Sequence, residues 1–144
     1  MNPEQTTCPM CESAYLIPKK AVEHYCYKGH DFSLEEIEYA ECPACHSEVV
    51  TPEQSKRNET RIRDEHRKID GFLTSTEIAQ LRKRFKVTQS QAAQIFGDRG
   101  FSKYESGEVT QSLAMDKLMK LALKVPYCFE ELCKIANVQV IENV

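Results

Sequence analysis

The spacing of hydrophobic and polar positions changes near residue 50 of the chain. Before that point, "AVEHYCY" (21–27) and "FSLEEIEYAEC" (32–42) are rich in β-branched and aromatic residues, and "KGHD" between them is typical of a turn. From Leu73 onward, apolar residues recur at helical spacing. The sequence therefore predicts an α+β fold that is mainly α, with a small N-terminal β domain followed by an all-α domain of about five helices.

Capping boxes mark where several helices begin. "TPEQ" (51–54), "TSTE" (74–77) and "TQSQ" (88–91) each place a threonine three residues before Glu or Gln. The helix after Thr51 has few apolar residues, and we interpret it as an exposed connector or a partly paired helix that ends at "DGF". The later helices are expected at about 75–85, 89–96, 99–106, 112–124 and 126–137, and the tail after 137 is either a short strand or frayed.

A short phrase containing two cysteines occurs twice, as "CPMCE" (8–12) and "CPACH" (42–46). A CxxC turn lets two thiolates converge on one ion, and two such turns supply the tetrahedral four-sulfur site that zinc prefers. A region of about 43 residues buries too little apolar surface to fold without such a staple. We predict one structural Zn²⁺ per chain, with iron in a rubredoxin-like site as the alternative; the ligands are Cys8, Cys11, Cys42 and Cys45.

The residues around the cysteine pairs refine this prediction. Pro9 and Pro43 suit tight turns because proline fixes φ. Glu12 and His46 stand where zinc knuckles often have glycine, since the turn can need positive φ. His46 adjoins Cys45 and is a competing ligand, although such a histidine is more often solvated. We interpret the three remaining cysteines as buried small hydrophobic residues: Cys26, Cys128 and Cys133.

Composition and charge limit the function further. The chain is 41% hydrophobic and 28% charged, which is ordinary for a globular protein, and no apolar run approaches the ~20 residues of a membrane span. With no secretory signal at the start, the expected location is cytoplasmic. Residues 1–51 carry a net charge of −6 and residues 52–144 a net charge of +3, so the two halves are expected to have different partners.

The segment "VTQSQAAQIFG" followed by "DRGFSKYESG" has the pattern of a helix-turn-helix. Phe101 and Tyr104 are expected to face inward. Arg and Lys can bind the acceptors of guanine in the major groove, and a Gln at a helix N-terminus can bind a phosphate or a base edge. The predicted DNA-binding residues are Gln89, Arg99, Ser102 and Lys103, and an ordinary helical domain with solvated basic faces is the alternative.

With both sites in place, the chain resembles the MqsA/YgiT-type antitoxins, which combine an N-terminal zinc domain with a C-terminal helix-turn-helix of the Xre/Cro type. The resemblance rests on "CPMC", "CPAC", "LRKRFKVTQSQAAQIFG" and "FSKYESGEVTQSLAMDKLMKL". It implies the domains 1–50 (zinc binding), 51–72 (linker helix) and 73–144 (DNA binding and dimerisation). Ser102 and Lys103 match the Ser-Arg of the family's recognition helix, whereas Arg99 stands where the family usually has a base-reading asparagine.

The resemblance also implies partners. These are double-stranded operator DNA, a second copy of the chain through the C-terminal domain, and a cognate toxin, often an mRNA-cleaving enzyme (an mRNA interferase). The implied function is therefore that of a type II antitoxin that neutralises its toxin and represses its own operon. The alternatives are a stand-alone or phage-borne regulator whose zinc ribbon binds protein, and a thiolate-based redox or metal sensor. No enzyme activity is expected, because we find no Ser/His/Asp set, no open metal site and no phosphate loop.

Overall fold

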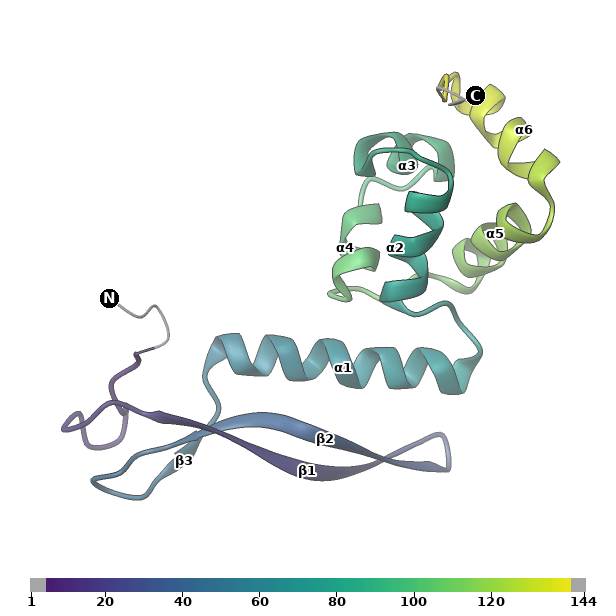
Figure 1. Ribbon diagram of the computed structural model, residues 1–144. Coiled ribbons are helices and arrows are strands. Elements are labelled where there is room, and N and C mark those ends of the chain that lie inside the picture. The colour runs from purple at the N-terminus through teal and green to yellow at the C-terminus, as the bar shows by residue number, and fades with distance from the viewer. Residues whose placement is uncertain (1–4, 141–144) are drawn as a thin grey trace. The chain divides into compact units, whose positions relative to one another are not determined.

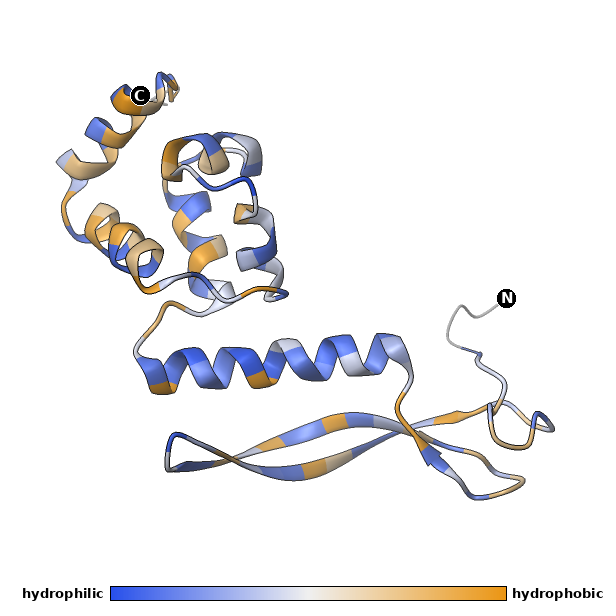
Figure 2. Cartoon of the chain, turned by 180° about the vertical axis from the view of Figure 1, so that it is seen from behind, coloured by the Kyte–Doolittle hydropathy of each residue, from blue (hydrophilic) through white to orange (hydrophobic). Residues whose placement is uncertain are grey.

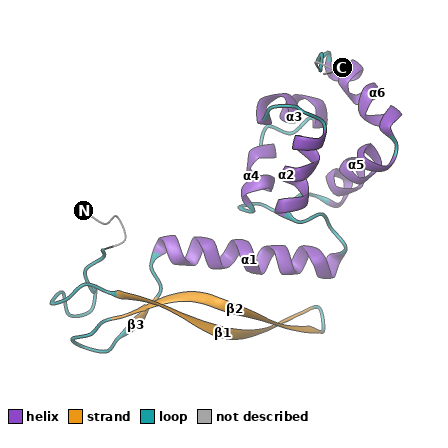
Figure 3. Ribbon diagram, in the orientation of Figure 1, coloured by secondary structure: helices purple, strands orange, loops and turns teal. Residues whose placement is uncertain are grey.

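The strands precede the helices along the chain (Figures 1 and 3). The computed structural model describes residues 5–140 and confirms the predicted α+β class. The elements are β1 (Ile17–Tyr27), β2 (His30–Glu41), β3 (Glu48–Val49), α1 (Pro52–Asp70), α2 (Ser75–Arg84), α3 (Gln89–Phe96), α4 (Phe101–Ser106), α5 (Leu113–Lys124) and α6 (Pro126–Ala136).

The three strands form one antiparallel sheet in the order β1-β2-β3. The β1–β2 turn consists of Lys28 and Gly29, which both have positive φ, as a hairpin turn with the right-handed strand twist requires. The register shifts between Ala21 and Glu23, opposite a bulge in β2 where Glu36 has φ 59°. Arg61 of α1 holds this bulge, because its guanidinium donates to the carbonyl oxygens of residues 35 and 36.

Beneath the cysteine loops lies a very small core. Its buried members are Cys8, Leu16, Ala40 and Cys42, with Cys11, Ala14 and Val49 partly buried around them. Two of the four buried side chains are thiols that are expected to bind metal. Apolar packing alone is therefore a weak source of stability in this region, as its length predicted.

Helix α1 is hydrophilic along most of its length (Figure 2), yet it is well anchored. A capping box begins it: Gln54 N–H donates to Thr51 Oγ1 at 3.2 Å, and Thr51 N–H donates to Gln54 Oε1 at 3.0 Å. Gln54 is 5% exposed and donates to the carbonyl of Tyr39. Asn58 bonds both the N–H and the carbonyl of Glu38, so its side chain extends the hydrogen bonding of β2.

The chain divides into two compact units, Met1–Ile62 and Arg63–Val144. The division falls inside α1, which contributes its first half to one unit and its last half to the other. The predicted helix at 51–72 is thus present as α1, and the functional roles assigned to the segments on either side stay predictions.

The second unit is helical, and its helix boundaries follow the predicted capping residues. Thr74 and Thr88 form the capping boxes of α2 and α3, and Gly97 and Gly107 end α3 and α4 in the left-handed conformation that favours glycine. The apolar faces of these helices meet in one core: Leu73, Ile78, Leu81, Val87, Ala92, Ile95, Phe96, Phe101, Tyr104, Met119, Ala122, Phe129 and Cys133.

Several details differ from the sequence predictions. Helix α4 begins at residue 101 rather than 99, because Asp98 accepts a hydrogen bond from Gly100 N–H in a turn before the helix. Cys26 is exposed on β1, so the buried interpretation is wrong there, since the side chain lies on a solvated strand; Cys128 is partly buried and Cys133 is buried.

The C-terminal tail was predicted to be a strand or frayed. Residues 138–140 form no strand in the structure, but Val138 and Val140 pack against the helical core. Residues 141–144 of that prediction lie outside the described part. None of the described helices is long and apolar enough to cross a membrane.

Candidate metal centre and nucleic-acid interface

The two cysteine phrases fold into two copies of the same loop. In each, the residue after the second cysteine donates its N–H to the carbonyl of the first cysteine, Glu12 to Cys8 and His46 to Cys42, both at 2.9 Å. Both donors have positive φ, 56° for Glu12 and 63° for His46. The turn therefore does need the left-handed conformation for which glycine is common, and this chain adopts it without glycine.

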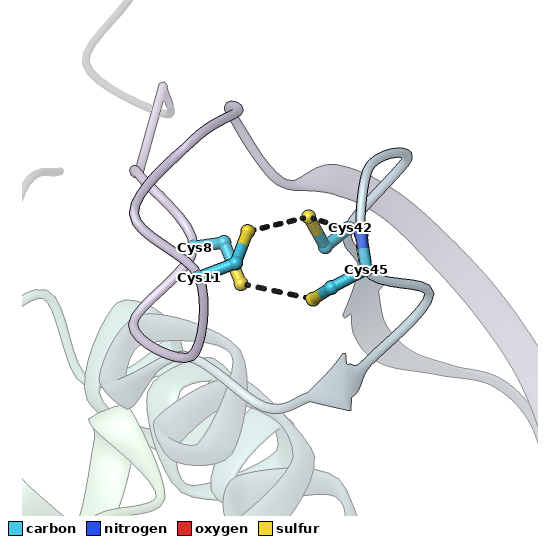
Figure 4. A group of neighbouring side chains, drawn as sticks. All are labelled: Cys8, Cys11, Cys42 and Cys45. Carbon is cyan, nitrogen blue, oxygen red and sulfur yellow. Dashed lines mark hydrogen bonds between the residues drawn. The ribbon is translucent and has the colours of Figure 1, made fainter.

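The loops bring four sulfur atoms together (Figure 4). Cys8 Sγ lies 3.8 Å from Cys45 Sγ, Cys11 Sγ lies 3.5 Å from Cys42 Sγ, and all four lie within 4.8 Å of one another. A tetrahedral ion with metal–sulfur bonds of about 2.3 Å separates its sulfurs by about 3.8 Å. The four cysteines thus form a metal-binding arrangement whose dimensions suit zinc.

Two of the sulfurs also receive backbone hydrogen bonds. Met10 N–H points to Cys8 Sγ and Cys45 N–H points to Cys42 Sγ, each at 3.4 Å. Such N–H groups stabilise the thiolate form that binds metal. The Cys45 N–H is the main cause that lowers the pKa of Cys42 below its ordinary value.

The other two thiols have opposite shifts. A hydrogen bond with Ser47 lowers the pKa of Cys45 to about 6. At Cys11 the backbone at Ser13 acts to lower the pKa, but the neighbouring Cys42 thiol and burial outweigh it and raise the pKa to about 11. The closely spaced thiols thus shift one another's pKa, and a divalent cation would displace their protons.

His46 does not join the sulfur cluster. Its side chain is 77% exposed, and its Nδ1 lies 3.8 Å from Glu41 Oε1. The group of converging ligand atoms contains the four cysteines alone among the described residues. The structure thus favours His46 as a solvated neighbour rather than a ligand.

The predicted DNA-binding residues lie on exposed parts of α3, α4 and the turn between them. Gln89, Ser102 and Arg99 line one open groove together with Ser90, Ala93, Gln94, Gly97 and Asp98. Lys103 is exposed on α4 but is outside that lining. The structure thus brings three of the four residues together, and their contact with DNA stays a prediction.

Glu105 on the inner side of α4 ties this surface together. Its carboxylate accepts from Arg82 Nε of α2 at 2.6 Å and from Gln89 Nε2 of α3 at 2.8 Å. The pair is largely buried, with side-chain exposures of 22% for Arg82 and 6% for Glu105. One carboxylate therefore connects three helices and fixes the side chain of Gln89.

Hydrogen bonds to Asp98 hold the turn before α4. The Tyr104 hydroxyl donates to Asp98, whose other oxygen accepts from Gly100 N–H at 2.8 Å. The Tyr104 hydrogen bond lowers the pKa of Asp98, while burial and the carboxylate raise the pKa of Tyr104 to about 12. Asp98 thus connects the turn to the inward face of the helix that follows it.

Sequence reasoning missed two groups of residues. Ser90 and Gln94 share the groove with Gln89, and their helical spacing along α3 could have indicated it. The second group is a buried polar network around Arg67, Gln111 and Asp116, which lie 0%, 2% and 1% exposed. No local pattern indicates that network, because Arg67 and Gln111 lie 44 residues apart in the sequence.

Comparisons with known proteins cover both sites. A family model described as the antitoxin component of a bacterial toxin-antitoxin system, MqsA, matches residues 6–133. The chain is also 24% identical over 128 residues to Antitoxin MqsA of Escherichia coli (strain K12), which covers 87% of this chain and 98% of that protein. Because the family model spans the four-cysteine loops and the helix-turn-helix together, the chain belongs to the MqsA antitoxin family.

Proposed function

We propose that the chain is the antitoxin of a type II toxin-antitoxin system, which neutralises a cognate toxin and represses its own operon by binding operator DNA. The observation that carries this proposal is the family match over residues 6–133, which includes both the sulfur cluster and the helix-turn-helix. The chain acts in this proposal as a cytoplasmic binding protein and not as an enzyme.

The metal in this proposal is one structural Zn²⁺ held by Cys8, Cys11, Cys42 and Cys45. The sulfur–sulfur distances of 3.5 and 3.8 Å support it, as does a core in which two of the four buried residues are cysteines. Four protein ligands leave no open coordination position, so the ion fixes the two loops and does no chemistry.

DNA is read in this proposal by α4 and the turn before it. Arg99, Ser102 and Lys103 supply base contacts in the major groove, and Gln89 with Ser90 at the start of α3 contacts phosphate. Gln94, one turn further along α3, joins the groove wall. Replacing Arg99 or Lys103 by Ala should weaken operator binding about tenfold or more, whereas Gln89→Ala should weaken all sequences alike.

The chain forms a homodimer through its C-terminal helices in this proposal. Large apolar side chains on and between α5 and α6 are exposed in the single chain, among them Leu121 at 48%, Tyr127 at 63% and Ile135 at 81%. A second copy that covers them would give the complex two-fold symmetry. The operator should then be palindromic, with half-sites about one or two helical turns apart.

The toxin partner is proposed to bind the N-terminal half. That half carries the net charge of −6 over residues 1–51, which complements the basic surface of an RNA-binding toxin. The same charge repels DNA, so the N-terminal half should contribute nothing to operator affinity, and any repulsion should weaken as salt rises.

The test is a co-purification and a gel-shift assay on the full chain. The tagged chain is expressed with the product of the adjacent gene, and it is titrated against a duplex from upstream of its own coding sequence. We expect the neighbouring protein to co-purify and the duplex to shift. Specific DNA binding without a protein partner would instead favour a stand-alone regulator, and a partner without DNA binding would remove the repressor role.

A further inference from the structure

Two arginines of α1 hold the loop that follows α4. Arg67 donates from Nη2 to the carbonyl of Val109 at 2.5 Å and from Nε to Gln111 Oε1 at 3.1 Å. Arg63, one turn earlier, donates to the carbonyl of Gly107. Gly107 ends α4, so these side chains grip the chain directly after the helix that is proposed to read DNA.

The same guanidinium is held from its other side. Its Nη1 donates to Asp64 Oδ1 at 2.7 Å, and Asp64 also accepts from the N–H of Ser75 at 2.9 Å and from its hydroxyl at 2.6 Å. Ser75 is the first residue of α2. Arg67 therefore connects the start of α2 with the end of α4.

Gln111 and Asp116 extend this hydrogen-bond network to the backbone of Leu73. Gln111 Nε2 donates to the carbonyl of Leu73 at 2.9 Å, and Asp116 Oδ1 accepts from the N–H of Leu73 at 2.8 Å. Lys120 lies 2.8 Å from Asp116. Among the described residues, no buried side-chain nitrogen or oxygen in this region lacks a partner.

Stability alone is a weak reason for such an arrangement. Arg67 is fully buried, and a buried ion pair typically gains little over apolar side chains of the same size. What a planar guanidinium gives, and an apolar side chain does not, is a fixed geometry among several acceptors. Here these acceptors are a carbonyl of the α4–α5 loop, the side chain of Gln111 and the carboxylate of Asp64, which also bonds Ser75 at the start of α2.

We propose that Arg67 is a positioning residue for DNA recognition: from a helix that makes none of the expected DNA contacts, it sets the orientation of α4 by clamping the Gly107–Gln111 loop. This inference rests on the proposed DNA-binding function. It implies that the DNA-reading unit begins within α1, at Arg63, and not after it, in keeping with the division of the chain at that residue.

The test compares full-length variants on two labelled duplexes of equal length, one from upstream of the chain's own coding sequence and one with that sequence shuffled. Arg67→Met removes the clamp, and Arg67→Lys keeps its charge without the planar guanidinium. Arg63→Met removes the contact with the carbonyl of Gly107, which comes from a partly exposed side chain. The matched control is Lys68→Met, which removes the same charge from the adjacent exposed position, where Lys68 pairs with Glu65.

A misoriented α4 loses base contacts but keeps most phosphate contacts. We therefore expect both Arg67 variants to lose about tenfold or more in affinity for the upstream duplex, with little change on the shuffled duplex and an unchanged salt slope. Arg63→Met should lose less affinity for the upstream duplex than the Arg67 variants do. Lys68→Met should keep the wild-type ratio of affinities for the upstream and shuffled duplexes. Hydrogen exchange should rise at the N–H groups of Gly107 and Val109, which bond Tyr104 and Lys103.

Four results would overturn the inference. Equal losses on both duplexes would show a purely structural effect, and full rescue by Arg67→Lys would show that charge alone matters. If the Arg67 variants fail to fold, the Arg63→Met variant serves as the test. A wild-type ratio of affinities for the two duplexes in that variant would refute the clamp. A wild-type chain that binds both duplexes equally would instead refute the DNA-reading function, and the inference with it.

Discussion

Glu12 and His46 place ordinary side chains where the backbone turns left-handed. Their φ values of 56° and 63° allow the hydrogen bonds that close the two cysteine loops. A non-glycine residue in this region costs about 1–2 kcal/mol. The metal-binding loops therefore hold strain that the sulfur–metal bonds must outweigh.

Glycine at these two positions should stabilise the metal-bound chain. Glu12→Gly and His46→Gly each relieve the left-handed strain, and the added freedom of the unfolded chain offsets part of it, which leaves about 0.5–1 kcal/mol. The measurement is thermal unfolding with zinc present. Met10→Gly is the control, because Met10 is 70% exposed in the same loop without positive φ, and it should not stabilise.

Tyr104 and Asp98 give a pH-dependent contribution at the residue scale. The pKa of Asp98 is below its ordinary value of 3.8, first because of the Tyr104 hydroxyl. A lowered folded pKa stabilises the fold above about 3.8, and this contribution is lost as the pH falls through the folded pKa. Tyr104→Phe should cost about 1–2 kcal/mol near neutral pH. In urea unfolding at a series of pH values, the difference from wild type should shrink below about pH 4; a constant difference would contradict this assignment.

At the scale of the element, α4 is a helix of six residues without a side-chain cap. Such a short helix is not stable alone, so its neighbours must hold it. Phe101 and Tyr104 are buried in the core, Glu105 bonds Arg82, and the loop after Gly107 is held by α1. The outward face is thereby left to residues that need not pack, which the proposed contacts with DNA require.

The Arg82–Glu105 pair should show strong coupling. Removing one partner leaves a largely buried charge without its counterion, so Glu105→Leu should cost about 3 kcal/mol. The double change Arg82→Met with Glu105→Leu should recover much of that loss. A double-mutant cycle by chemical unfolding measures the coupling, and purely additive costs would show that the pair contributes nothing as a pair.

At the scale of the whole molecule, the two units depend on different forces. The cluster beneath the cysteine loops of the N-terminal unit has four buried residues, whereas the core cluster of the helical unit has thirteen. Zinc chelation, or serine at any of the four cysteines, should therefore unfold the first unit and spare the second. Circular dichroism should show loss of strand signal with a persisting helical transition, and metal analysis of the wild type should find about one zinc per chain. A zinc-free chain whose first unit stays folded would refute the structural metal.

Truncation should reveal where the helical unit begins. A chain of residues 63–144 keeps Asp64 and Arg67, whereas one of residues 73–144 leaves Ser75 and Gln111 without these partners. Unsatisfied buried polar groups cost about 1–3 kcal/mol each, so the shorter chain should melt at a clearly lower temperature. Equal melting temperatures would mean that α1 adds nothing to this unit.

The sequence by itself determined what depends on local chemistry. Cysteine spacing, capping threonines and glycine stops act within a few residues, so the four-sulfur cluster, most helix boundaries and the α+β class could be predicted. Helical spacing along α3 could have predicted the groove residues Ser90 and Gln94, but they were not among the predicted DNA-binding residues. Cys26 was misassigned because strand burial depends on what covers the strand.

Only the tertiary structure decided the role of α1. Its composition resembles that of an exposed connector, yet Asn58 completes the hydrogen bonding of β2 and Arg67 is fully buried against a loop more than 40 residues away. A buried charge is tolerated only where distant partners surround it, and no local pattern records which residues the fold brings there. Local sequence thus predicted the residues of the two sites, and three-dimensional packing decided which residues hold α4 in place.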